Sequence, residues 1–132
     1  MLKKDFFLRT INEFLKALQD VISFYKNDNL DASNEILKNS YAFLGNTKLF
    51  FEKEDSEVIL NFLINQKNGI EKIKLLAELF LTHSKITVDQ EKNMLLSKSL
   101  YFFQYYDMYS GVFSFEIKNL ISSINKQVIE NN

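Results

Sequence analysis

The sequence predicts an all-α fold, and three observations lead to that prediction. The chain contains no proline, and its three glycines are Gly45, Gly69 and Gly111. Each glycine lies where one segment of periodic apolar residues ends and the next begins. Proline and glycine interrupt helices strongly, and the apolar residues between them recur at the helical spacings of three and four. We therefore expect about six helices, packed as stacked antiparallel helical hairpins in a single domain over residues 1–132.

The first two helices are predicted over residues 5–26 and 30–44. The apolar stripe of the first helix consists of six residues at spacings of three and four, which place them on one face of the helix: Phe7, Ile11, Phe14, Leu18, Ile22 and Tyr25. Three turn-forming residues at positions 27–29 end this helix. The second helix ends at Gly45 and Asn46, a pair typical of a helix C-terminus.

The middle of the chain is predicted to be the least regular part. Residues 46–57 contain a short apolar anchor at 49–51 and then a run of charged residues. A third helix is expected over 56–66, capped by Asp55 or Ser56. Asn68 and Glu71 have the spacing of a capping box, which predicts that a fourth helix opens there and runs to about residue 86.

The last two helices are separated by Ser110 and Gly111. Thr87 and Gln90 form a second capping-box pattern, which predicts a fifth helix that continues to about residue 109. A sixth helix is expected over 113–130. The turn at residues 28–32 (DNLDA) resembles the Gly-Asp-Tyr-x-x-Ala turn of tetratricopeptide units, although no second turn follows at their repeat length of roughly 34 residues.

Two stretches carry a resemblance to a known family. Residues 4–14 (KDFFLRTINEF) and residues 113–116 (FSFE) are similar to the first and last helices of that family. It is a family of small bacterial proteins of unknown function with tetratricopeptide-like helices. The resemblance implies a helical-hairpin fold. It implies no functional residue, because the family has no established activity.

Composition excludes several classes of protein. The net charge is −1, and neither half of the chain has the basic excess that nucleic-acid binding requires. Apolar runs are too short for a membrane helix or a signal peptide, so we expect a cytoplasmic protein of bacterial type with no membrane partner. The absence of cysteine excludes disulfides, thiolate metal sites and cysteine nucleophiles.

Polar side chains give little support to an enzyme. His83 is the only histidine, and Glu78 on the same predicted helix is five residues away, so we expect neither a catalytic nor a metal site and predict a partly exposed His83. The acidic residues Glu52, Glu54, Asp55 and Glu57 lack the spacing of a calcium loop and are expected to favour a helix N-terminus. The sequence therefore predicts no catalysis, no cofactor and no metal.

The aromatic tract over residues 101–115 is the unusual feature of the chain. Tyr101, Tyr105 and Tyr109 lie four residues apart and form one row along the predicted fifth helix. The row either packs against a neighbouring helix or contacts a partner, since tyrosine suits both environments. Phe6, Phe7 and Leu8 offer a rival apolar surface at the N-terminus.

These observations favour a non-catalytic, tetratricopeptide-like interaction module. Such a module would hold a protein or peptide on its helical surface, with Tyr101, Tyr105 and Tyr109 as the candidate partner-binding residues. A structural homodimer that uses the aromatic surface is the alternative. A small enzyme that works through carboxylates alone ranks third.

Overall fold

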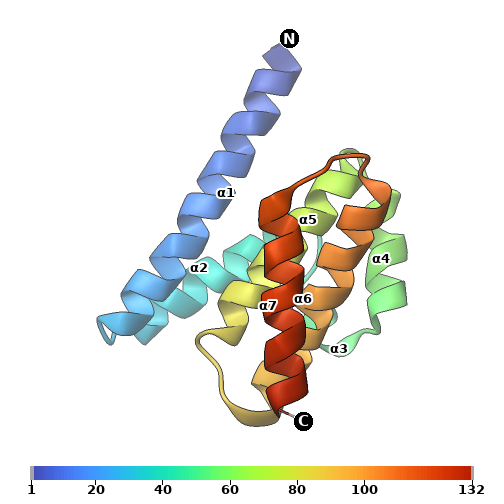
Figure 1. Cartoon of the computed structure of the whole chain (residues 1–132). Helices are drawn as coiled ribbons and strands as arrows, with labels where there is room; N and C mark the ends of the chain where they lie inside the picture. Colours follow the sequence, from blue (N-terminus) through green and yellow to red (C-terminus); the bar gives the residue numbers. More distant parts are fainter. Residues whose placement is uncertain (1, 132) are drawn as a thin grey trace.

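The computed structural model describes residues 2–131, and this part of the chain forms seven α-helices (Figure 1). They are α1 (Leu2–Lys26), α2 (Leu30–Phe43), α3 (Lys48–Lys53), α4 (Ser56–Ile64), α5 (Gly69–Ser84), α6 (Asp89–Tyr109) and α7 (Phe115–Asn131). The all-α prediction is therefore confirmed. Met1 and Asn132, which belong to the predicted domain, lie outside the described residues.

The helix count differs from the prediction because of α3. This short helix lies in the segment that the sequence predicts to be irregular. Thr47 caps it, since its hydroxyl accepts a hydrogen bond from the Phe50 N–H at 3.1 Å. Phe51 is completely buried and ties the helix to the core. A single turn of helix with one buried anchor is too short to show the periodicity on which the prediction depends.

Both predicted capping boxes are wrong. Asn68 adopts a left-handed conformation with φ 59° and its side chain makes no cap hydrogen bond. The Thr87 hydroxyl donates to the backbone carbonyls of His83 and Ser84, so Thr87 closes α5 rather than opening α6. The predicted helix start at Asn68 is nevertheless right, since Asn68 is the N-cap residue and α5 begins at Gly69. Helix α6 begins at Asp89, and α5 ends at Ser84 instead of residue 86.

Gly69 is required where α5 starts against the end of α4. A Cβ atom at this position would lie 2.6 Å from the Leu63 carbonyl oxygen and 2.9 Å from the Ile64 carbonyl oxygen. Both obstacles are backbone atoms, which cannot rotate away. The absence of a side chain therefore allows the close approach of the two helices.

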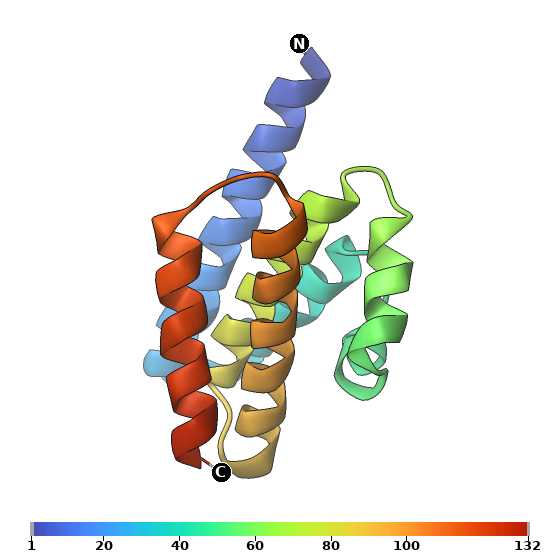
Figure 2. The ribbon, with the colours of Figure 1, turned by 45° about the vertical axis from the view of Figure 1, so that its right-hand side comes forward.

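The helices pack as antiparallel neighbours around α5. Helix α5 contacts α1, α2, α4 and α6, and α7 packs on α6 (Figures 1 and 2). Helix α1 also packs on α2. Buried serine hydroxyls connect two pairs of helices, because Ser33 of α2 donates to the Val21 carbonyl of α1 and Ser99 of α6 donates to the Ala77 carbonyl of α5, each at 2.8 Å. The N-terminal part of α1 projects beyond the other helices, and the two ends of the chain lie far apart (Figure 1).

The apolar stripe of α1 is confirmed in its centre and wrong at its end. Phe14 and Leu18 are buried, as predicted, and Val21 is buried more completely than its neighbour Ile22. Tyr25, the last member of the predicted stripe, is 40% exposed. The buried stripe therefore ends about one turn before α1 itself ends at Lys26.

Candidate functional site

His83 is a buried residue, which corrects the prediction that it is partly exposed. It lies on α5 and is only 2% exposed. Its Nδ1 atom is 2.8 Å from the hydroxyl oxygen of Tyr41 on α2, and Tyr41 is completely buried. This hydrogen bond between two buried groups holds the imidazole ring in one orientation.

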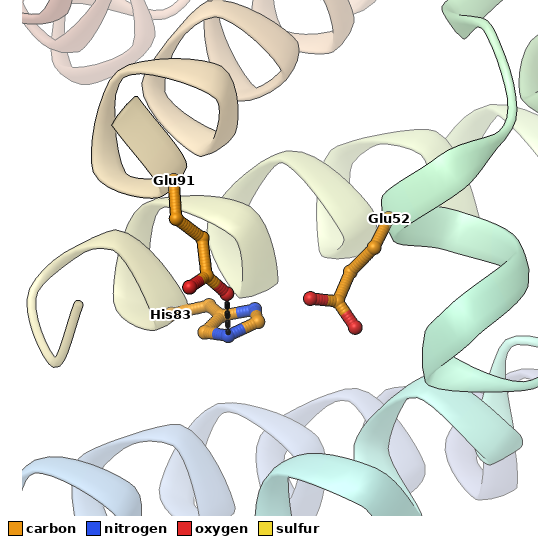
Figure 3. A group of neighbouring side chains, drawn as sticks. All are labelled: Glu52, His83 and Glu91. Atoms are coloured by element: carbon orange, nitrogen blue, oxygen red, sulfur yellow. Dashed lines mark ion pairs between the residues drawn. The ribbon is translucent and has the colours of Figure 1, made fainter. Parts of the chain in front are cut away.

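Two glutamates from other helices converge on this histidine. Glu52 comes from α3 and Glu91 from α6, and both carboxylates point toward the His83 ring (Figure 3). One carboxylate oxygen of each glutamate and one ring nitrogen of His83 all lie within 4.8 Å of one another. The Nε2 atom of His83 is 3.9 Å from Glu91 Oε1, which is longer than a hydrogen bond.

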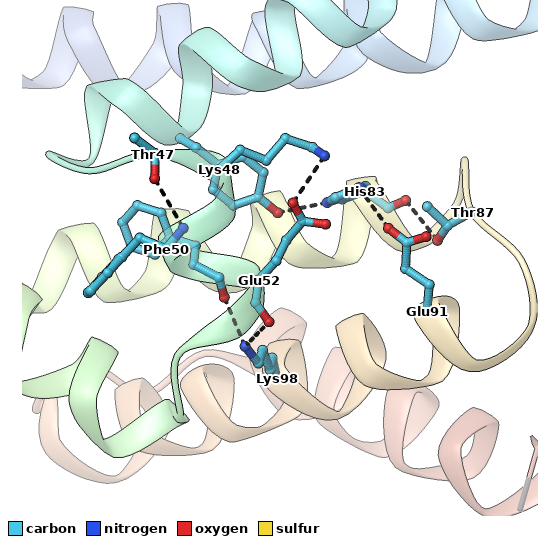
Figure 4. A network of polar contacts seen from close by, with 10 residues as sticks. Thr47, Lys48, Phe50, Glu52, His83, Thr87, Glu91 and Lys98 are labelled. Atoms are coloured by element: carbon cyan, nitrogen blue, oxygen red, sulfur yellow. Dashed lines mark hydrogen bonds and ion pairs between the residues drawn. The ribbon is translucent and has the colours of Figure 1, made fainter.

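Two lysines hold Glu52 in place (Figure 4). The Lys48 ammonium lies 3.1 Å from Glu52 Oε1 and forms an ion pair along α3. Lys98, on α6, donates a hydrogen bond of 2.7 Å to the backbone carbonyl of Glu52. Lys48 therefore holds the side chain of Glu52, and Lys98 holds its backbone carbonyl.

Burial decides the charge state of the central pair. Desolvation, with a smaller contribution from Lys48, lowers the pKa of His83 to about 4, so the ring is neutral at pH 7. Burial also raises the pKa of the Tyr41 hydroxyl well above its usual value, and Glu52 and Glu91 raise it further. The site thus presents a neutral imidazole to two carboxylates.

An open groove reaches this polar cluster from the α2–α3 side. It has a volume of about 920 Å³, and its lining includes Lys38, Thr47, Lys48, Leu49 and Glu52. On the other side of the cluster, the side chain of Glu91 is 51% exposed. Solvent and small ions can therefore approach both glutamates.

The predicted tyrosine row lies on α6, but its three side chains are not equally exposed to solvent. Tyr101 and Tyr105 are half-buried and pack against the core, whereas Tyr109 is 61% exposed. The rings of Tyr105 and Tyr109 are in contact, with centroids 4.6 Å apart. Only the last tyrosine of the row is open to a partner over most of its surface.

A larger exposed surface continues from Tyr109 through the α6–α7 connection. It consists of five side chains that are between 53% and 74% exposed, and we call it the aromatic corner: Met108, Tyr109, Val112, Phe113 and Phe115. The rings of Phe113 and Phe115 meet edge to face at 4.8 Å, and the Lys118 ammonium lies 5.4 Å from the Phe113 ring centre. The two phenylalanine rings of the corner are therefore held against each other, with the Lys118 ammonium beside them.

Sequence reasoning missed the cluster around His83 and part of the corner. Glu52 and Glu91 are separated from His83 by helix ends, so no spacing along one helix could bring them together. Met108 and Val112 carry no signal beyond their apolar character. Phe113 lies in the α6–α7 connection and Phe115 is the first residue of α7, and Ser110 with Gly111 were the sequence signs of that connection.

Glu78, on α5, gives a prediction about stability. Its Oε2 atom is buried without a hydrogen-bond partner among the described residues. Desolvation raises the pKa of Glu78 from 4.5, while Lys74 opposes the rise and Glu116 adds to it. The folded state therefore binds this proton more tightly than the unfolded chain does, and stability falls as the pH rises through and above 4.5. We expect Glu78→Gln to raise the free energy of unfolding at pH 7 by on the order of 1 kcal/mol.

Urea unfolding at pH 7 and at pH 4 tests this expectation. The gain should shrink at the lower pH, where Glu78 is mostly protonated in both the folded and the unfolded state. Glu35→Gln on the exposed face of α2 serves as the control for loss of a charge. Equal or lower stability of Glu78→Gln at pH 7 would show that the carboxylate is well solvated.

Comparisons of the chain with protein-family models, with curated proteins and with solved structures found no match. The resemblance drawn from residues 4–14 and 113–116 thus identifies no family, and what stands is a small all-helical protein. None of the helices within residues 2–131 combines the length and the apolar character needed to span a membrane.

Proposed function

We propose that this protein is a non-catalytic interaction module whose contact surface is the aromatic corner. The observation that carries the proposal is the exposure of five large apolar side chains within segment 108–115. Apolar surface concentrated in this way is costly in water and marks contact sites on soluble proteins. Tyrosine, phenylalanine and methionine are also the residues enriched at the centres of protein interfaces.

The partner that we propose is a second copy of the chain. The five side chains of the corner present on the order of 600 Å² of accessible surface. A stable interface buries roughly 800 Å² on each partner, so the corner and its polar rim approach the required area. The interaction is therefore expected to be of moderate strength, with a dissociation constant in the micromolar range.

Charges at the rim of the corner support a symmetric contact. Lys118 and Asp107 form an exposed ion pair of 3.1 Å beside the apolar side chains, and Glu116 is exposed next to Phe115. A two-fold axis through the corner allows Lys118 of each copy to face an acidic residue of the other. The net charge of −1 adds little repulsion between copies.

The tetratricopeptide-like character of the hairpins is part of the same proposal. The antiparallel contacts of α1 with α2 and of α5 with α6 support it, as does the sharp turn at Asp28, where φ is 60°. An exposed apolar surface at the connection between two helices suits a module that binds another protein and catalyses no reaction.

Sedimentation velocity over a series of protein concentrations tests the proposal. The wild-type chain should shift from monomer to dimer as the concentration rises. The double variant Phe113→Ser, Phe115→Ser should remain monomeric while keeping a cooperative urea transition, because neither ring is part of the core. Both rings are more than half exposed, so their removal costs little folding energy.

The double variant Phe6→Ser, Leu8→Ser is the matched control. These residues are exposed on the projecting part of α1 and form the rival apolar surface. Dimerisation lost in this variant but kept in the corner variant would assign the contact to α1. A wild-type chain that stays monomeric at every concentration would refute the proposal of a second copy.

A further inference from the structure

We propose that Glu52, His83 and Glu91 form a binding site for one divalent first-row transition-metal ion such as Zn²⁺. The site goes beyond the interaction function and is independent of the aromatic corner. Three helices, α3, α5 and α6, each contribute one ligand (Figure 3). Nitrogen and carboxylate oxygen are ligands that zinc accepts in proteins, and three protein ligands leave room for water on the ion.

The orientation of His83 is the observation that points to a ligand. The ring is buried, and its Nε2 atom lies 3.9 Å from Glu91 Oε1, which is too far for a hydrogen bond. Its other nitrogen is held by the Tyr41 hydroxyl at 2.8 Å. Histidines that bind metals use one nitrogen as the ligand while a second residue fixes the other nitrogen, as Tyr41 does here.

The geometry is within reach of metal coordination. Ligand atoms about 2.1 Å from a tetrahedral ion lie about 3.4 Å from one another. The ligand atoms of this site lie within 4.8 Å of one another, and Nε2 of His83 lies 3.9 Å from Glu91 Oε1. Rotation of the Glu52 side chain and of the half-exposed Glu91 side chain would bring the ligand atoms to this separation.

The charges around the site favour a cation and limit its affinity. Lys48 pairs with Oε1 of Glu52, which leaves the second oxygen of that carboxylate for the ion. Since one ligand is an imidazole, the site suits transition metals better than Mg²⁺ or Ca²⁺, which prefer oxygen ligands alone.

This proposal departs from the expectation of no metal, which composition suggested. A chain with one histidine and no cysteine has few metal ligands. Folding nevertheless brings that histidine to two glutamates that are remote from it in sequence. The same composition simplifies a metal-binding experiment, because the chain has no thiolate and no second imidazole that could compete for the ion.

Titration of the tag-free, metal-free protein with Zn²⁺ tests the site. We expect one ion per chain, a dissociation constant in the micromolar range, and a large shift of the ¹⁵N resonance of the single imidazole. Glu52→Gln and Glu91→Gln should each weaken binding at least about tenfold. Glu91 is exposed, so its variant should keep the wild-type thermal unfolding curve.

Glu35→Gln is the control, because it removes an exposed glutamate from α2, away from the cluster. Its affinity for Zn²⁺ should equal that of the wild type. A wild-type protein without micromolar binding overturns the proposal. So does a loss of less than tenfold in either glutamate variant, or an imidazole resonance that Zn²⁺ leaves in place.

Discussion

Replacing Phe14 with alanine is expected to lower the free energy of unfolding by about 3–5 kcal/mol. Phe14 lies on the buried face of α1, and its ring packs against the ring of Phe43 on α2, with the ring centroids 5.6 Å apart. The substitution removes apolar contact between α1 and α2 and leaves a cavity that rigid helices fill only in part. The midpoint of urea unfolding should therefore fall far below that of the wild type.

Phe6→Ala provides the matched control for this prediction. It makes the same change on the same helix, at a side chain that is 71% exposed. Its unfolding midpoint should stay close to that of the wild type. Equal midpoints for Phe14→Ala and the wild type would mean that α1 adds nothing to the cooperative core.

Lys98→Met is expected to lower the free energy of unfolding by about 3 kcal/mol, the second large effect. The Lys98 ammonium donates to three backbone carbonyls at the end of α3, those of Phe51 at 2.9 Å, Glu52 at 2.7 Å and Glu54 at 2.9 Å. Carbonyls at a helix C-terminus lack partners within the helix, and this cation satisfies them. Methionine keeps the apolar stem but leaves the carbonyls unpaired.

Thermal and urea unfolding of Lys98→Met measure this loss. Lys16→Met on the exposed face of α1 controls for the removal of a lysine charge, and it should leave stability unchanged. Stability of Lys98→Met equal to that of the control would show that water satisfies the α3 carbonyls. The prediction would then be wrong, and Glu52 would depend on Lys48 alone for its position.

The periodic apolar pattern was sufficient to predict the long helices. Phe14 and Leu18 on α1 are buried as their spacing predicts. Helix ends were less predictable, because a capping pattern at Asn68 or Thr87 has the same letters whether or not the side chain makes the bond. The sequence did not predict helix α3, because a helix of six residues is too short to show an apolar periodicity.

The candidate sites were predictable only in part, for a different reason. The aromatic tract pointed to the α6–α7 region, and it led to Tyr109 and to the rings of Phe113 and Phe115. The burial of His83 and its meeting with Glu52 and Glu91 depend on how three helices pack. A single sequence contains no direct signal for contacts between side chains on different helices.

A spin-label distance measurement tests the central claim, the contact through the aromatic corner, most directly. The chain has no cysteine, so Asn119→Cys labels one exposed position on α7, next to the corner. Ser23→Cys labels an exposed position near the far end of α1 as the control. At concentrations where the dimer forms, pulsed EPR should give a short, well-defined distance between the two labels at position 119 and a much longer distance, or none, at position 23. A short distance at position 23, or no dipolar signal at position 119, would contradict the contact.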